Sequence, residues 1–190
     1  MKLNIKTILF NQNEIDRMLH RMAYEILEQN SNIDTMIIIG IKTRGIYLAK
    51  RLAQIIDSTE SKKILVDSLD ITFYRDDLTK TGDQPAVRKA DIMFDIKDKN
   101  VILVDDVLYT GRTVRAGLEA LIESARPKRV QLAVLIDRGH RELPIYADYI
   151  GRKVPTSKKE IIKVQIKEVD MDENVLVATN SNHCNCDNEL

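Results

Sequence analysis

Two adjacent carboxylates stand at the end of an apolar run in the segment "VILVDDVLYTGRT", residues 101–113. Neighbouring aspartates repel each other and are poor strand formers, so packing alone does not explain Asp105 and Asp106. If the apolar run is a strand of a parallel sheet, the carboxylates lie at its carboxyl end, where such sheets bind their ligands. There they could accept hydrogen bonds from the hydroxyl groups of a sugar.

The residues after the carboxylates suit a phosphate group. Gly111 allows close backbone approach, and Thr110 and Thr113 bring hydroxyl donors. A helix that begins here would also present unpaired N–H groups and the positive end of its dipole. The two features together indicate a site for a phosphorylated sugar. The structural alternative is an acidic turn with a threonine cap, which needs no ligand. The sequence contains neither the P-loop pattern nor the dinucleotide-binding pattern, so the segment would be a different kind of phosphate site.

A second glycine-flanked loop, Gly40–Gly45, follows the apolar run "TMIIIG". Lys42 and Arg44 supply cations, and the flanking glycines permit close backbone approach to a ligand. Such charges are more often solvated on a loop. A second strand-end loop of this kind in the same sheet favours an anionic ligand.

The bulk properties are those of a globular protein. The chain has 190 residues, is 44% apolar and 31% charged, and has a formal net charge of zero, so no whole-molecule field attracts nucleic acid or membrane. No apolar run approaches the roughly 20 residues that span a bilayer, and the N-terminus does not match a signal peptide. We therefore expect a cytoplasmic protein.

Strand-like and helical patterns alternate along the chain. Apolar periodicity predicts helices over 13–30, 46–58 and 114–125, with strands over 35–40, 62–74, from 101 to the carboxylates, and over 129–137. Residues 161–179 predict an antiparallel hairpin, and residues 76–92 a long functional or mobile loop. This order predicts an α/β fold with a mostly parallel central sheet flanked by helices. We expect one domain over 1–180 and a polar, disordered tail over 181–190. Cys184 and Cys186, beside His183, could bind a metal ion or could be part of the disordered tail.

The segment "VILVDDVLYTGRT" closely resembles the phosphoribosyl-diphosphate (PRPP) motif of type I phosphoribosyltransferases. The segments "GIKTRGIYLAKRLA", "DITFYRDDLTK" and "QLAVLIDRGHRELPIYADYIGRKVPTSKKE" resemble the family of bifunctional pyrimidine-operon attenuation regulators with uracil phosphoribosyltransferase activity. The resemblance runs from about residue 10 to about residue 178. It implies the type I phosphoribosyltransferase fold and a reaction in which uracil and PRPP give UMP and diphosphate. It also implies Mg²⁺ bound through PRPP near Asp105 and Asp106, with no direct protein ligand assigned.

The resemblance assigns roles to individual residues. Asp105 and Asp106 hold the ribose, and a cis peptide bond is expected near Ile41–Lys42 in the diphosphate loop. Tyr74, Arg75 and Asp76 introduce a flexible hood over the site, although the same stretch could be a plain surface loop. The remaining assignments are the 5′-phosphate to Thr110, Gly111, Arg112 and Thr113; the diphosphate to Ile41, Lys42, Thr43 and Arg44; and the base to Tyr109, Asp137, Arg138 and His140.

Two departures from purine-using relatives favour uracil. Those enzymes carry an aspartate before the Thr-Gly pair and a lysine at the end of the following strand, where this chain has Tyr109 and Asp137. His140 could equally be a surface histidine, and its role comes only from the resemblance. A salvage phosphoribosyltransferase for another base, without an RNA role, stays an alternative.

The resemblance also implies binding to a pyrimidine-leader mRNA, sensed through UMP and PRPP, and a homodimer or larger homo-oligomer. A chain that is mainly an RNA-binding attenuator is therefore the alternative from a different functional class. Gln29, Tyr146 and Tyr24 stand where the family often has arginine or histidine, so we expect weaker RNA binding than is typical. Candidates for the RNA-binding face are Arg17, Arg21, Arg141, Arg152 and Lys153.

Overall fold

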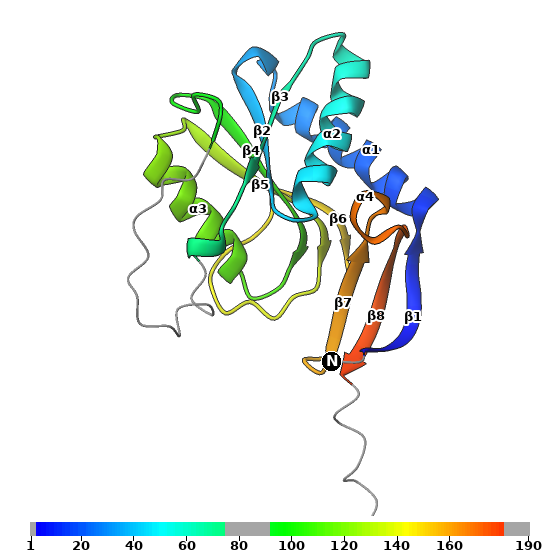
Figure 1. Cartoon of the computed structure of the whole chain (residues 1–190). Helices are drawn as coiled ribbons and strands as arrows, with labels where there is room; N and C mark the ends of the chain where they lie inside the picture. Colours follow the sequence, from blue (N-terminus) through cyan, green and yellow to red (C-terminus); the bar gives the residue numbers. More distant parts are fainter. Residues whose placement is uncertain (1–2, 75–91, 181–190) are drawn as a thin grey trace, which may run out of the picture.

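The computed structural model describes residues 3–74 and 92–180, and it contains two sheets and four α-helices within those ranges (Figure 1). The helices are α1 (Gln12–Gln29), α2 (Gly45–Glu60), α3 (Arg112–Ser124) and the short α4 (Lys167–Asp170). The strands are β1 (Leu3–Asn11), β2 (Met36–Ile41), β3 (Leu65–Leu69), β4 (Asn100–Leu108), β5 (Arg129–Asp137), β6 (Tyr149–Lys153), β7 (Glu160–Gln165) and β8 (Asn174–Asn180).

The larger sheet is parallel, with the strand order β3-β2-β4-β5-β6. The chain moves outward from β2 to β3 and then returns to β4 on the other side of β2. It continues outward through β5 and β6. The order of connection therefore reverses between β2 and β4, which is the position where open parallel sheets bind ligands.

Helices cover both faces of this sheet, so its inner strands carry long apolar runs; in β4 the run is followed by Asp105 and Asp106. Alternate residues of β2 pack to opposite sides: Ile38 joins the core under α1 and α2, and Ile37 and Ile39 join the core under α3 (Figure 1). All six residues of β2 are buried, as expected for a strand covered twice.

The helix ends follow local sequence signals. The side chain of Asn11 accepts a hydrogen bond from the N–H of Glu14, and the Glu14 side chain accepts one from the N–H of Asn11. This reciprocal capping box begins α1 one residue earlier than the apolar periodicity predicted. No helix in the described residues is long and apolar enough to cross a membrane.

The smaller sheet is antiparallel, with the order β1-β8-β7. The predicted hairpin is confirmed as β7 and β8, although α4 lies in its connection. The strands β1 and β6 were not predicted, and β3 covers only Leu65–Leu69 of the strand predicted over 62–74. Predicted strand and helix boundaries elsewhere agree closely with β5 and α3.

Candidate functional site

The two loops predicted to bind ligand leave the sheet side by side, after β2 and at the end of β4. A Cβ atom on Gly45 would lie 2.4 Å from the carbonyl oxygen of Val104 and 3.3 Å from Cα of Asp105. The first turn of α2 therefore packs directly on β4 beside the carboxylate pair. The glycine that was predicted to admit a ligand is needed here for contact between two backbones.

The carboxylates lie within β4, which continues to Leu108. Asp105 is buried, with 5% of its surface exposed. Its Oδ1 accepts the N–H of Asp106 at 2.9 Å, and Oδ1 of Asp106 accepts the N–H of Val107 at 2.8 Å. Burial and then the negative charge of Asp106 raise the pKa of Asp105 well above its usual value. Burial also raises the pKa of Asp106, against the opposing effect of the Arg44 cation. Such a pair suits a ligand that brings positive charge or hydroxyl donors.

The loop after β2 brings two cations to the same edge. The Nζ atom of Lys42 lies 3.6 Å from a carboxylate oxygen of Asp70, and Arg44 pairs with Asp170. The expected cis peptide bond lies between Lys42 and Thr43, one bond after the predicted position. The side chain of Ile41 is buried in the core, so only its backbone could face a ligand.

The predicted 5′-phosphate loop joins β4 to α3. Gly111, with φ +94°, is the N-cap of α3, and the Thr110 Oγ1 accepts the N–H of Arg112 at 3.4 Å. The Nε of Arg112 donates to a carboxylate oxygen of Glu142 at 2.8 Å. The N–H group of Glu142 also donates to the carbonyl oxygen of Thr110 at 3.0 Å. The start of α3 is thus tied to the loop that follows β5.

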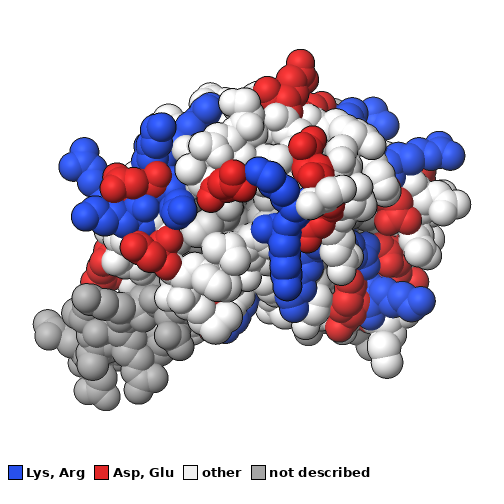
Figure 2. Space-filling view, turned by 90° about the horizontal axis from the view of Figure 1, so that it is seen from above, with Lys and Arg blue, Asp and Glu red and all other residues white. Residues whose placement is uncertain are grey.

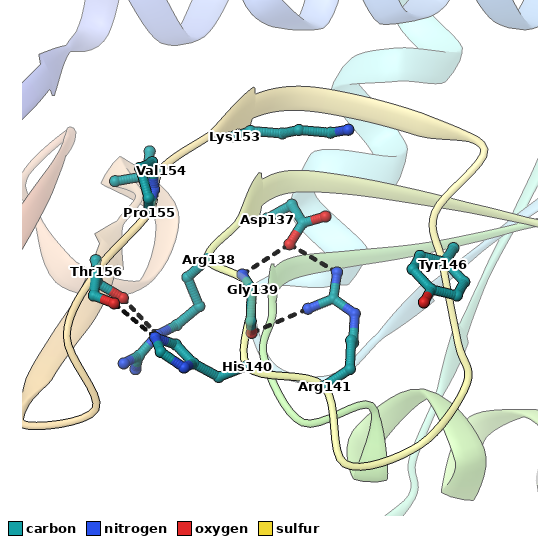
Figure 3. A pocket seen from close by; sticks show the side chains of 10 residues that line it. All are labelled: Asp137, Arg138, Gly139, His140, Arg141, Tyr146, Lys153, Val154, Pro155 and Thr156. Carbon is teal, nitrogen blue, oxygen red and sulfur yellow. Dashed lines mark hydrogen bonds and ion pairs between the residues drawn. The ribbon is translucent and has the colours of Figure 1, made fainter.

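That loop, Arg138–Ile145, is here called the base loop, and with the end of β6 it borders a pocket of about 570 Å³ (Figure 3). The Arg138 guanidinium lies 4.0 Å from the centroid of the Tyr109 ring, and the His140 ring meets the same ring edge-on at 6.2 Å. The structure therefore brings together three of the four residues predicted to bind the base, with Arg138 and His140 against the ring of Tyr109. The pocket is lined by Asp137, Arg138, Gly139, His140, Arg141, Tyr146, Lys153, Val154, Pro155 and Thr156.

Arg138 and His140 are both anchored to the segment after β6. Arg138 donates from Nη2 to the carbonyl oxygen of Glu160 at 2.7 Å, and burial lowers its pKa. The Nε2 of His140 contacts the carbonyl oxygen of Thr156. Because a carbonyl cannot donate, Nε2 carries the proton. A neutral His140 then has Nδ1 as its acceptor.

Two residues predicted for the RNA-binding face also line the pocket. Arg141 retains only 13% exposure of its side chain and forms an ion pair with Asp137 at 2.6 Å. Its guanidinium also donates to the carbonyl oxygens of Tyr109 and Ile145 at 2.7 and 2.9 Å. Lys153 lines the pocket because β6 pairs with β5, which sets Lys153 opposite Asp137. The position of Lys153 could not be read from local sequence, because it depends on the pairing of β6 with β5. Arg141 is held by Asp137 and Ile145, each four residues away, and also by the carbonyl oxygen of Tyr109, which is 32 residues away.

The other three candidates for the RNA-binding face are exposed, as is Lys153. Arg17 and Arg21 lie on α1 and Arg152 lies on β6. The Nη2 of Arg21 donates to the carbonyl oxygens of Ile150 and Gly151 at 2.8 and 2.6 Å, so these residues share one side of the molecule. Figure 2 shows Lys and Arg interspersed with Asp and Glu on the face that it displays.

Of the predicted hood residues, the structure describes only Tyr74, whose hydroxyl group donates to Glu123. Arg75 and Asp76 lie outside the described residues, as does the tail with His183, Cys184 and Cys186.

Comparison with known proteins shows the family to which the chain belongs. Residues 6–174 match the model of the phosphoribosyl transferase domain. The chain belongs to the phosphoribosyltransferase family. It is 54% identical over 180 residues to "Bifunctional protein PyrR" of Bacillus subtilis (strain 168), covering 94% of this chain and 99% of that protein. The protein of the same name from Alkaliphilus metalliredigens is 55% identical over 177 residues, covering 93% of this chain and 97% of that one.

These relatives confirm the resemblance: the chain is a phosphoribosyltransferase of the bifunctional pyrimidine-operon regulator family. Solved structures confirm the fold. A hypoxanthine phosphoribosyltransferase from Trypanosoma cruzi matches with a TM-score of 0.70 at 15% identity, covering 94% of this chain and 93% of that one. A hypoxanthine-guanine phosphoribosyltransferase from Bacillus anthracis matches with a TM-score of 0.66 at 18% identity, covering 94% and 100%.

The donor set also bears on the metal expected with PRPP. Among residues 3–74 and 92–180, no group of three or more His, Cys, Asp or Glu residues could hold a metal by itself. Asp105 and Asp106 nevertheless offer two carboxylates, and Mg²⁺ typically binds one or two carboxylates together with substrate phosphates. The residues present therefore fit a magnesium ion that arrives with its phosphorylated substrate.

Proposed function

We propose that this enzyme transfers the phosphoribosyl group of PRPP to uracil, giving UMP and diphosphate. The observation that carries the proposal is the meeting, at one edge of the sheet, of a carboxylate pair, two phosphate-type loops and a pocket. The 54% identity to "Bifunctional protein PyrR" supports the pyrimidine specificity.

Each part of PRPP has a proposed place. Asp105 and Asp106 accept hydrogen bonds from the ribose hydroxyls, and the segment Thr110–Thr113 at the start of α3 binds the 5′-phosphate. Lys42 and Arg44, with the backbone of the loop Ile41–Arg44, bind the diphosphate. Mg²⁺, held by PRPP oxygens near Asp105 and Asp106, would supply positive charge to the leaving group.

The chain's own chemistry is positioning and electrostatics. A transition state that resembles an oxocarbenium ion gains from the negative charge of the buried carboxylates, which requires no nucleophile from the protein. The pocket between the base loop and β6 takes uracil; Arg138 and His140 line it, and the Tyr109 ring packs against both. Asp137 also lines the pocket, and its Oδ1 atom is fixed by the N–H of Gly139 and the guanidinium of Arg141.

The test is release of diphosphate from PRPP with a panel of bases. We expect uracil to be used with a higher kcat/KM than hypoxanthine or guanine, because Tyr109 and Asp137 supply neither the acid nor the cation that purine-using relatives carry there. Comparable efficiency with a purine would refute the base assignment while leaving the enzyme class intact.

The family also supports a second role, binding of a pyrimidine-leader mRNA in a way that depends on UMP and PRPP. The exposed arginines on α1 and β6 are the proposed contacts. Retention of a leader stem-loop from the source genome, measured against salt concentration with and without UMP, tests this role separately from catalysis.

A further inference from the structure

Arg44 of the diphosphate loop is bound by a carboxylate from the other sheet. Asp170 ends α4, in the connection between β7 and β8, and lies 126 residues further along the chain. The Nε of Arg44 donates to Asp170 Oδ2 at 2.9 Å, and Nη2 donates to Oδ1 at 2.6 Å. Two parallel bonds of this kind fix both the position and the plane of a guanidinium group.

Asp170 is itself held in place. Its Oδ2 accepts the N–H of Ile166 at 3.1 Å, and its own N–H donates to the carbonyl oxygen of Ile166 at 2.8 Å. The hydrogen bonds from Arg44 are the largest influence that lowers the pKa of Asp170, and the charges of Arg44 and Lys163 act in the same direction. The carboxylate is therefore an ionised, fixed acceptor at neutral pH.

The pairing leaves Arg44 able to bind a second anion. A guanidinium has five N–H donors, and the bonds to Asp170 use one on Nε and one on Nη2. Three donors remain. The charge of Arg44 also acts to lower the pKa of Asp106, so the guanidinium is within electrostatic reach of the carboxylate pair of β4.

The other two cations of the proposed PRPP site are paired differently. Lys42 and Asp70 are each 51% exposed, and Arg112 and Glu142 are 57% and 52% exposed. Such pairs are weak in water and exchange readily for a phosphate. Arg44 and Asp170 are only 27% and 10% exposed, and their contact is bidentate. Asp170 therefore acts as a support that persists when diphosphate is bound.

We propose that Asp170 is a positioning residue for phosphoribosyl transfer: it holds the Arg44 guanidinium at the edge of the site, so that the remaining N–H donors take the diphosphate group of PRPP. The inference rests on the proposed role of Ile41–Arg44 in binding diphosphate. It makes α4 and the smaller sheet part of the substrate site. Ordering the arginine in advance removes part of the side-chain entropy that binding would otherwise cost.

The test measures binding of inorganic diphosphate, with Mg²⁺, to the full chain by calorimetry. Asp170→Asn keeps the shape of the side chain but removes its charge and replaces one acceptor oxygen with a donor. We expect about tenfold weaker diphosphate binding, as for a lost hydrogen bond between charged groups. We also expect a higher KM for PRPP with an unchanged KM for uracil. Asp170→Glu should recover part of the affinity.

Glu168→Gln is the matched control. Glu168 lies in the same turn, and it pairs with Arg51, which also pairs with Glu173 and lies outside the site. We expect diphosphate affinity within about twofold of the unmodified protein in this control, since surface pairs contribute little. An equal loss in both variants would show that α4 merely docks the smaller sheet, and the proposal would be overturned.

A double-mutant cycle separates the proposal from the function on which it rests. In an Arg44→Ala background, Asp170→Asn should cause no further loss of diphosphate affinity. Additive losses, or unchanged or tighter binding by Asp170→Asn alone, would overturn the positioning role. If Asp170→Asn does not fold, the same cycle is run with Asp170→Glu. Failure to make UMP from uracil and PRPP, with the coupling intact, would refute the uracil assignment and leave the positioning role standing.

Discussion

Arg141 should behave as an anchor of the base loop and contribute little to RNA binding. Its Nη1 donates to the carbonyl oxygens of Leu108, Tyr109 and Gly139 at 3.3, 2.7 and 3.1 Å. Its Nε donates to Ile145, and its Nη2 pairs with Asp137. These contacts join the end of β4, the end of β5 and the far end of the base loop through one guanidinium.

Arg141→Ala leaves all of these acceptors without that partner. Removing one member of a buried ion pair costs about 3–5 kcal/mol, and a typical lost hydrogen bond costs about 1 kcal/mol. The two side chains of the pair are 13% and 12% exposed, so the loop can open and let water replace part of the loss. We therefore expect a decrease of about 3 kcal/mol in the free energy of unfolding, together with a raised KM for uracil.

Urea unfolding followed by circular dichroism measures the first effect, with Arg152→Ala as the control. Arg152 is exposed and lies 5.9 Å from the Phe10 ring, so its removal should change the unfolding free energy by less than about 0.5 kcal/mol. The reasoning fails if Arg141→Ala unfolds like the unmodified protein and only reduces the salt slope of RNA binding by about one unit, as a simple phosphate contact would.

Three further predictions concern the carboxylates, the aromatic stack and RNA. Asp105→Asn and Asp106→Asn should each cut transfer strongly, and near-normal PRPP turnover by the double variant would contradict the ribose assignment. Burial raises the folded-state pKa of Asp105 above its unfolded value of about 3.9. The contribution of Asp105 to stability is therefore present below the unfolded pKa and is lost as pH rises through the folded pKa. The free energy of unfolding of Asp105→Asn, measured by urea titration, should exceed that of the unmodified protein by an amount that grows with pH over this window. Arg138→Lys should raise the KM for uracil several-fold. An ammonium group cannot reproduce the planar stack, 4.0 Å from the centroid of the Tyr109 ring, or the two hydrogen bonds to Thr156 and Glu160. An unchanged KM for uracil would show that Arg138 does not contribute to the base site. RNA binding should be weaker, with a smaller salt slope, than for the Bacillus subtilis relative assayed with the same leader RNA. Equal or tighter UMP-enhanced binding at physiological salt would show that Gln29, Tyr24 and Tyr146 do not reduce the RNA affinity.

The sequence by itself determined the strands and helices that form the centre of the fold. Strand β2 and residues 132–136 of β5 are continuous apolar runs because helices cover both faces of the sheet, and that composition is visible without a structure. It also determined which residues stand near strand ends: Asp105 and Asp106 follow directly on an apolar run, and packing alone does not explain two carboxylates there. Chemistry that depends on neighbours in sequence, as at Thr110–Thr113, could therefore be predicted.

Only the tertiary structure decided what several charged residues contact. Arg141 and Lys153 look like free surface cations in the sequence, yet the pairing of β6 with β5 and the path of the base loop bring both to the pocket. The support of Arg44 by Asp170 depends on how the smaller sheet packs near α2, across 126 residues of chain. Where the partner of a charged side chain lies far along the chain, the sequence carries no local signal of it. Such a partner is set by the packing of whole strands and helices, and that packing depends on apolar surfaces far apart in the sequence.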